Sequence, residues 1–122
     1  MNWRKAPETV IQAFDAALPD DPAVQRRKMF GYPCAFVNGN MFAGLHQENI
    51  AVRLPEKRRS EAIANGVQQF EPMPGRPMRE YIVVPPADYT NKTRLSAWLD
   101  EAFRFAAAMP IKEPKPRRAR KA

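Results

Sequence analysis

Apolar side chains recur at helical spacing near the beginning of the chain. Pro7 suits the first turn of a helix, because its missing N–H would have no partner there in any case. Pro19 and the turn-forming residues after it end the pattern. We therefore expect a helix between these two prolines, and its apolar face consists of Val10, Ile11, Phe14 and Leu18.

The same spacing returns more completely near the other end. Residues 91–109 follow the i, i+3, i+4, i+7 pattern of an amphipathic helix. A shorter surface helix is expected over residues 55–66, which begin with proline and end with glycine. The apolar face of the long helix consists of Leu95, Trp98, Leu99, Ala102, Phe103 and Ala106.

Between the helices the pattern changes to that of short strands. Asn38-Gly39 is a strong hairpin signal, because a type I′ turn needs a positive φ at both positions. Short turns between successive strands favour an antiparallel meander of about four to five strands. The expected strands are residues 24–29, 33–37, 41–46, 50–54 and 81–84.

The hairpin register predicts which side chains share a face of the sheet. With Asn38 and Gly39 in the turn, the expected pairs are Val37 with Asn40, Phe36 with Met41 and Cys34 with Ala43. The uniformly apolar face is expected in the core, and the mixed face is expected to meet water or a partner. The core face would carry Cys34, Phe36, Met41, Ala43 and Leu45; the mixed face would carry Ala35, Val37, Asn40, Phe42, Gly44 and His46.

Together these elements predict an α+β fold with an N-terminal helix, an antiparallel meander, a short helix and a long amphipathic helix. A chain of 122 residues suits a single domain, which we place at residues 1–109. Residues 110–122 contain three prolines and almost no apolar side chain. They are therefore expected to form a disordered basic tail.

The positive charge of the chain is concentrated in that tail. The net charge is +7, of which six Lys/Arg and one glutamate in residues 110–122 supply +5, leaving +2 for the other 109 residues. Such a segment could neutralise nucleic-acid phosphates, and this binding would be weak, salt-sensitive and independent of the nucleotide sequence. A tail that only aids solubility is the alternative. The basic residues are Lys112, Lys115, Arg117, Arg118, Arg120 and Lys121.

Side chains suited to catalysis are few, since the chain has one cysteine and one histidine. A Cys–His dyad needs both side chains within hydrogen-bond reach, and the expected register puts Cys34 and His46 on opposite faces. No Cys/His/carboxylate cluster has the spacing of metal ligands, and Gly75 lies in no phosphate-binding loop. The sequence thus predicts no catalytic residue, no metal and no cofactor, in a protein that is not an enzyme.

The sequence also favours the cytoplasm. No run approaches the roughly 20 apolar residues of a membrane span, and the N-terminus lacks the apolar segment of a secretory signal. A single cysteine cannot form an internal disulfide, which agrees with a reducing compartment.

The mixed face of the hairpin offers a candidate surface for a protein partner. Phe42 is expected there beside Val37, with Arg53 in the next strand, and an aromatic residue near an arginine is typical of interfaces. A homodimer is left open as well. Other methionines and aromatics could line a ligand groove, although the core is the expected use for most: Met29, Phe30, Phe36, Met41 and Phe70.

Several motifs are familiar as a set. The chain resembles the N-terminal domain of the TfoX/Sxy family, bacterial regulators of natural competence, over residues 24–85 by motif and on to the last helix by pattern. The motifs are Lys28-Met29-Phe30-Gly31, Asn38-Gly39 before Met41-Phe42, Ile50-Ala51-Val52-Arg53, and Phe70-Glu71-Pro72-Met73-Pro74-Gly75 leading to Tyr81.

The resemblance implies an α+β domain whose curved antiparallel sheet has helices packed on one face. Two-domain members carry a further helical domain and act as transcriptional coactivators, whereas we expect this chain to stand alone. The resemblance supplies no catalytic residue or metal ligand. We therefore expect a non-enzymatic cytoplasmic adaptor that binds a protein partner in transcription regulation. Nucleic-acid binding through the tail is the main alternative, and a small-ligand or enzymatic module is a weaker one.

Overall fold

A computed structural model describes residues 5–111, and their strands form one antiparallel sheet in the order β1-β2-β3-β4-β6-β5. Tight turns join the first four strands into a meander, and β6 pairs with β4. The two-residue β5, which the sequence did not predict, brings the sheet to six strands. The strands are β1 (Gln25–Met29), β2 (Tyr32–Val37), β3 (Asn40–His46), β4 (Asn49–Arg53), β5 (Gln68–Gln69) and β6 (Tyr81–Val83).

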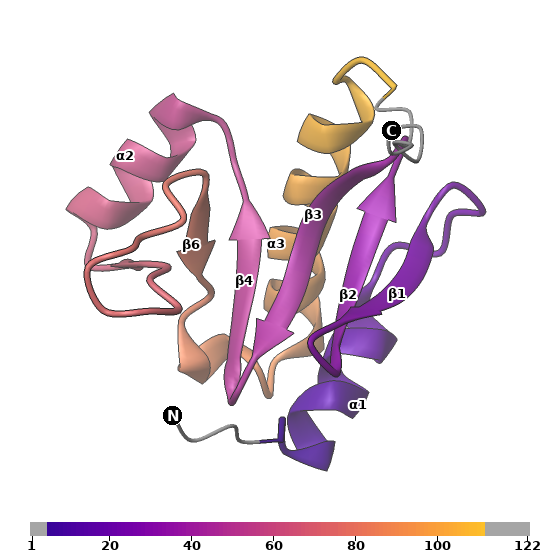
Figure 1. Ribbon diagram of the computed structural model, residues 1–122, viewed down its shortest axis with the longest axis horizontal. Coiled ribbons are helices and arrows are strands. Elements are labelled where there is room, and N and C mark those ends of the chain that lie inside the picture. The colour runs from indigo at the N-terminus through magenta and orange to yellow at the C-terminus, as the bar shows by residue number, and fades with distance from the viewer. Residues whose placement is uncertain (1–4, 112–122) are drawn as a thin grey trace, which may run out of the picture.

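The helices confirm the predicted α+β fold. In Figure 1, α3 runs behind the sheet, α1 lies beside it, and α2 stands near β6. The long helix packs on β2, β3 and β4 and also contacts α1. The bounds are α1 (Glu8–Ala17), α2 (Glu56–Ala64), the 3₁₀ turn η1 (Pro86–Asp88) and α3 (Lys92–Ala107).

The main core lies between the sheet and α1 with α3. Phe42 is fully buried there, and its ring meets Phe103 of α3 edge-on at a centroid distance of 5.6 Å. Alternate residues of β4 and β6 point to the same side, as a strand period of two requires. The strand residues of this core include Ala35, Val37, Phe42, Ala43, Leu45, Ile50, Val52 and Ile82.

The structure confirms the Asn38-Gly39 turn and corrects the register beyond it. Asn38 and Gly39 have φ values of 53° and 78°, and the Val37–Asn40 and Phe36–Met41 pairs form as predicted. The prediction that Cys34 pairs with Ala43 is wrong, because the register shifts between Ala35 and Phe36 and Cys34 pairs with Gly44.

The shift is a β-bulge that places one extra residue, Phe42, in β3. Phe42 and its neighbour Ala43 are both buried in the main core. The expected core face is therefore split. Ala43 and Leu45 join the main core, whereas Cys34, Phe36 and Met41 lie on the opposite side of the sheet.

Hydrogen bonds fasten α3 to one side of the sheet. The side-chain amide of Asn38 donates to the Ala107 carbonyl at 3.1 Å, and that of Asn40 donates to the Pro110 carbonyl at 3.1 Å. At the other end of the sheet, the Ile50 N–H donates to the Tyr89 hydroxyl at 2.8 Å. The face of the sheet opposite α3 is not covered by that helix.

Candidate functional site

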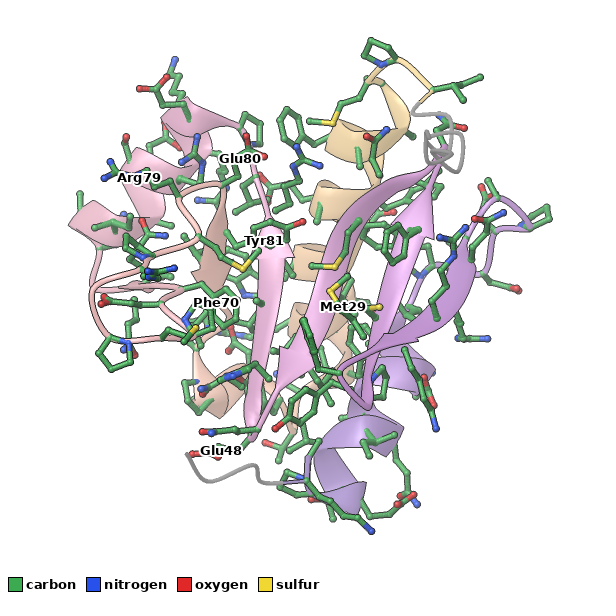
Figure 2. The ribbon with its side chains drawn as sticks, viewed as in Figure 1. Met29, Glu48, Phe70, Arg79, Glu80 and Tyr81 are labelled. Carbon is green, nitrogen blue, oxygen red and sulfur yellow. The ribbon has the colours of Figure 1, made fainter. Side chains whose placement is uncertain are left out.

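The candidate site lies on the sheet face opposite α1 and α3, which we call the open face; it is turned toward the viewer in Figures 1 and 2. A second, smaller apolar cluster forms there. It contains Ala51 of β4, Tyr81 and Val83 of β6, and Phe70 from the segment before β6, with Met41 packed against them. These positions alternate along their strands with residues of the main core.

An apolar depression of about 130 Å³ is hollowed into the open face. Gly44 lies at the bottom of the depression, where a larger residue would reduce its depth. A Cβ at this position would lie 3.2 Å from the Cβ of Cys34, which is a tight contact. Three methionines contribute to its walls, and such side chains adapt readily to irregular shapes. The depression is lined by Met29, Phe30, Tyr32, Cys34, Met41, Gly44, Leu45, His46, Ala51, Phe70, Pro72 and Met78.

Exposed large apolar side chains gather around this depression. Phe30 is 83% exposed and Met29 is 41% exposed, and both line it. Met78 also lines it and is exposed, and exposed Met73 belongs to the same 70–80 segment. Clustered exposed apolar groups mark an interaction site more often than single ones do.

Phe30 is held at the tip of the β1–β2 hairpin in an unusual backbone conformation. Met29 pairs with Tyr32, so Phe30 and Gly31 are the two turn residues, with φ values of 55° and 83°. A left-handed φ is costly for a bulky residue, and asparagine usually takes such a position. The core was the favoured prediction for Phe30, with a ligand groove as the alternative. Its position next to a glycine, as in Asn38-Gly39, was the signal for an exposed turn.

A polar network borders the apolar cluster. The Arg53 guanidinium pairs with Glu80 at 2.5 Å, and its Nη1 donates to the Met41 carbonyl at 3.5 Å. The Tyr81 hydroxyl donates to the same carbonyl at 3.0 Å. Burial raises the pKa of Tyr81 to about 12, and the positive charge of Arg53 offsets part of that rise. This network holds β3, β4 and β6 together from the open face.

The bulge brings Cys34 and His46 to the same face and the same depression, contrary to the sequence prediction. Their strand positions are diagonal, which separates such Cβ atoms by up to about 7 Å. The Cys34 thiol donates to the Arg27 carbonyl at 3.5 Å, while the His46 ring packs between Tyr32 and Phe70. Burial raises the pKa of Cys34, and the positive charge of Arg27 offsets part of that rise.

The three residues expected to form a partner face do not share a surface. Val37 and Phe42 are buried beneath α3, and Arg53 lies on the opposite, open face. The prediction is wrong for Val37 and Phe42 because it judged the faces from the hairpin alone. The alternation of Ile50 and Val52 in β4, opposite Ala43 and Leu45, decides which side α3 covers.

The remaining predictions concern metals, membranes and the tail. Within residues 5–111, no group of three or more His, Cys, Asp or Glu side chains is placed to hold a metal ion. No helix in the same part of the chain has the length and apolar character to cross a membrane. The six basic residues of the predicted tail lie outside the described residues: Lys112, Lys115, Arg117, Arg118, Arg120 and Lys121.

Comparison with known proteins gives one family assignment. Residues 16–106 match the model of the TfoX N-terminal domain, which is well over half of the 122-residue chain. No curated protein matches the sequence. The match runs from within α1 to one residue before the end of α3, so it takes in every strand of the sheet.

Proposed function

Since this chain belongs to the TfoX N-terminal domain family, we propose that it is a non-enzymatic adaptor that binds a protein partner through the open face. The resemblance to competence regulators leads us to place this binding in transcription regulation. The observation that carries the proposal is the grouping of exposed Met29, Phe30 and Met78 around one apolar depression. An aromatic anchor among methionines is typical of protein-binding surfaces.

The chemistry of the face supports binding rather than catalysis. Its one thiol has a raised pKa and bonds to a backbone carbonyl. Its arginine–glutamate pair, Arg53–Glu80, is part of the network that joins the strands. A catalytic site would need a nucleophile and a base in contact, and Cys34 and His46 have other partners.

The test is site-specific photo-crosslinking in cells of the source organism. A photoreactive phenylalanine analogue replaces Phe30, which is exposed, and in a matched control it replaces Ile63 of α2, which is 41% exposed. We expect a discrete crosslinked protein from position 30 alone, and we expect Met29→Glu to abolish it. Identical crosslinks from positions 30 and 63, or none from position 30, would contradict the proposal.

The charge of residues 112–121 favours nucleic-acid binding as the second candidate function. Six basic side chains could contact at most about six phosphates, each adding about 0.9 to the salt slope on duplex DNA. Replacing the six residues with glutamine in the full chain should then abolish a gel shift and leave the position 30 crosslink unchanged. A gel shift that survives these replacements would contradict the tail as the binding element.

A further inference from the structure

The open face carries arginines whose charge is not neutralised by the described part of the chain. The Arg27 guanidinium lies 4.7 Å from the centroid of the Phe36 ring and donates to the neutral Gln25 side chain. Arg76 and Arg79 are exposed on the segment that leads into β6, and neither guanidinium has an ion pair within residues 5–111. In Figure 2, Phe70 and Tyr81 lie between Met29 and Arg79, so basic groups stand on both sides of the apolar cluster.

Two carboxylates of the segment that leads into β6 already have partners. Glu80 pairs with Arg53, and the Glu71 carboxylate accepts a hydrogen bond from the Gly75 N–H at 2.6 Å. Arg27, Arg76 and Arg79 have no ion pair among residues 5–111, and Glu71 is the acidic side chain of the 70–80 segment that has none. These three arginines give the residues on both sides of the depression an excess of positive charge.

From this distribution we infer that the open face binds an acidic segment of a partner protein, which inserts one aromatic or leucine side chain into the depression. This inference rests on the proposed function and adds the chemistry of the partner. An apolar cavity of about 150 Å³ accepts a benzene-sized group, so the 130 Å³ depression suits one such side chain. Carboxylates on either side of that anchor would lie against Arg27 and against Arg76 and Arg79.

Charge also favours an acidic partner segment over two other occupants, a second copy of the chain and residues 112–121 of the same chain. A second copy of the chain would bring the same three arginines to the interface, and like charges across an interface are costly. Residues 112–121 of the same chain carry six positive charges and no aromatic side chain, so they match neither the rim nor the depression. The methionine side chains on the walls can adapt to anchoring side chains of different shape, which suits recognition of a group of related peptide sequences.

The experiment compares two synthetic peptides on the full-length protein. Both carry a central Leu-Phe pair; one has glutamates on each side of the pair, and the other has glutamines in their place. Binding is followed by the NMR signals of ¹³C-labelled methionine methyl groups. Met29, Met41 and Met78 report on the depression, and Met109, which follows the end of α3, serves as the internal reference.

We expect the glutamate peptide to shift the three reporter methyl groups and leave Met109 unchanged. The combined Arg76→Glu and Arg79→Glu variant should weaken that binding by about threefold to tenfold, since exposed ion pairs are individually weak. Lys92→Glu, a single charge reversal at the start of α3 and away from the open face, should have no effect. An unchanged Met109 signal in each variant shows that the fold is retained.

Four results would overturn the inference. Equal affinity for both peptides would show that the open face does not prefer acidic segments, and so would unchanged binding in the arginine variant. In either case a specific crosslink from position 30 would still support the proposed function. No shift of the reporter groups with either peptide would reject this class of occupant. Concentration-dependent shifts without peptide, with a dimer in sedimentation, would make a second copy the occupant.

Discussion

At the scale of single residues, Tyr81 connects the open face to the neighbouring strand. Its hydroxyl donates to the Met41 carbonyl, and its ring packs with Phe70 at a centroid distance of 6.4 Å. Replacement by phenylalanine keeps the ring and removes the hydrogen bond. We expect Tyr81→Phe to lower the free energy of unfolding by about 1 kcal/mol near pH 8, measured by urea denaturation. A variant as stable as the parent would contradict a structural role for this bond.

The raised pKa of Tyr81 predicts how this difference depends on pH. The folded protein holds the phenolic proton to about pH 12, whereas an unfolded chain releases it near pH 10. The contribution of Tyr81 to stability is therefore complete below about pH 10 and is lost as the pH rises toward 12. The stability advantage of the parent over Tyr81→Phe should shrink across this range. Tyr89, whose pKa is also raised by burial, is present in both proteins and cancels in the comparison.

Cys34 provides a direct test of the non-enzymatic proposal. Only the thiolate reacts with iodoacetamide, and burial raises the pKa of this thiol. At pH 8, alkylation of the folded protein should be about tenfold or more slower than alkylation of the urea-unfolded chain. Mass spectrometry follows the reaction, and Cys34→Ala is the blank. Faster alkylation of the folded protein would indicate an activated thiol beside His46 and would favour an enzyme.

At the scale of the elements, the turn of the β1–β2 hairpin carries an exposed aromatic side chain in a backbone conformation that lowers stability. Phe30 has a φ of 55°, a conformation that asparagine tolerates better and that Asn38 adopts in the next hairpin. Phe30→Asn should raise the free energy of unfolding by about 0.5–1 kcal/mol, since a left-handed φ costs a bulky residue about that much or more. The same variant should lose binding of the glutamate peptide. A fall in stability would show that Phe30 is a structural residue.

The β2–β3 hairpin is coupled to the end of α3 through Asn40. Its amide donates to the carbonyls of Pro110 at 3.1 Å and Asn38 at 3.3 Å, and the residue is buried. Asn40→Ala leaves these carbonyls short of a donor, which should cost about 1–3 kcal/mol. Thr9→Ala, an exposed position on α1, is the control for a polar-to-alanine change. Equal stabilities of the two variants in urea would show that the coupling is weak.

The elements also show what the sequence could reveal of the fold. The helical spacing from Leu95 to Ala106 and the Asn38-Gly39 turn are local signals, and both were confirmed. The ring of Phe42, the extra residue at the bulge, packs against Phe103, which is 61 positions away in the chain and so gives no local signal. Local alternation therefore gave the right hairpin and assigned most of its side chains to the wrong faces.

At the scale of the whole molecule, the candidate site depends on which face of the sheet the helices cover. The sequence favoured the core for Met29 and Phe30, with a ligand groove as the alternative, and made no prediction for Met78. They are exposed because α3 is held on the opposite face by Asn38, Asn40 and Tyr89. The basic rim has the same origin, since Arg27 and Arg76 become neighbours of one surface only through the strand order. Phe30-Gly31 gave a local signal for an exposed turn, but no single segment shows that three distant segments meet at one surface.

The two faces of this single sheet should respond oppositely to mutation. Phe42 is fully buried against α3, so Phe42→Ala leaves a cavity and should cost about 3–5 kcal/mol in urea unfolding. Met29 is partly exposed, and Met29→Ala should change stability by less than about 1 kcal/mol while reducing the crosslink from position 30. Equal loss of stability in both variants would mean that the open face is a structural layer of the domain. Binding would then have to involve a different surface, because side chains that pack within the fold are not available to contact a partner.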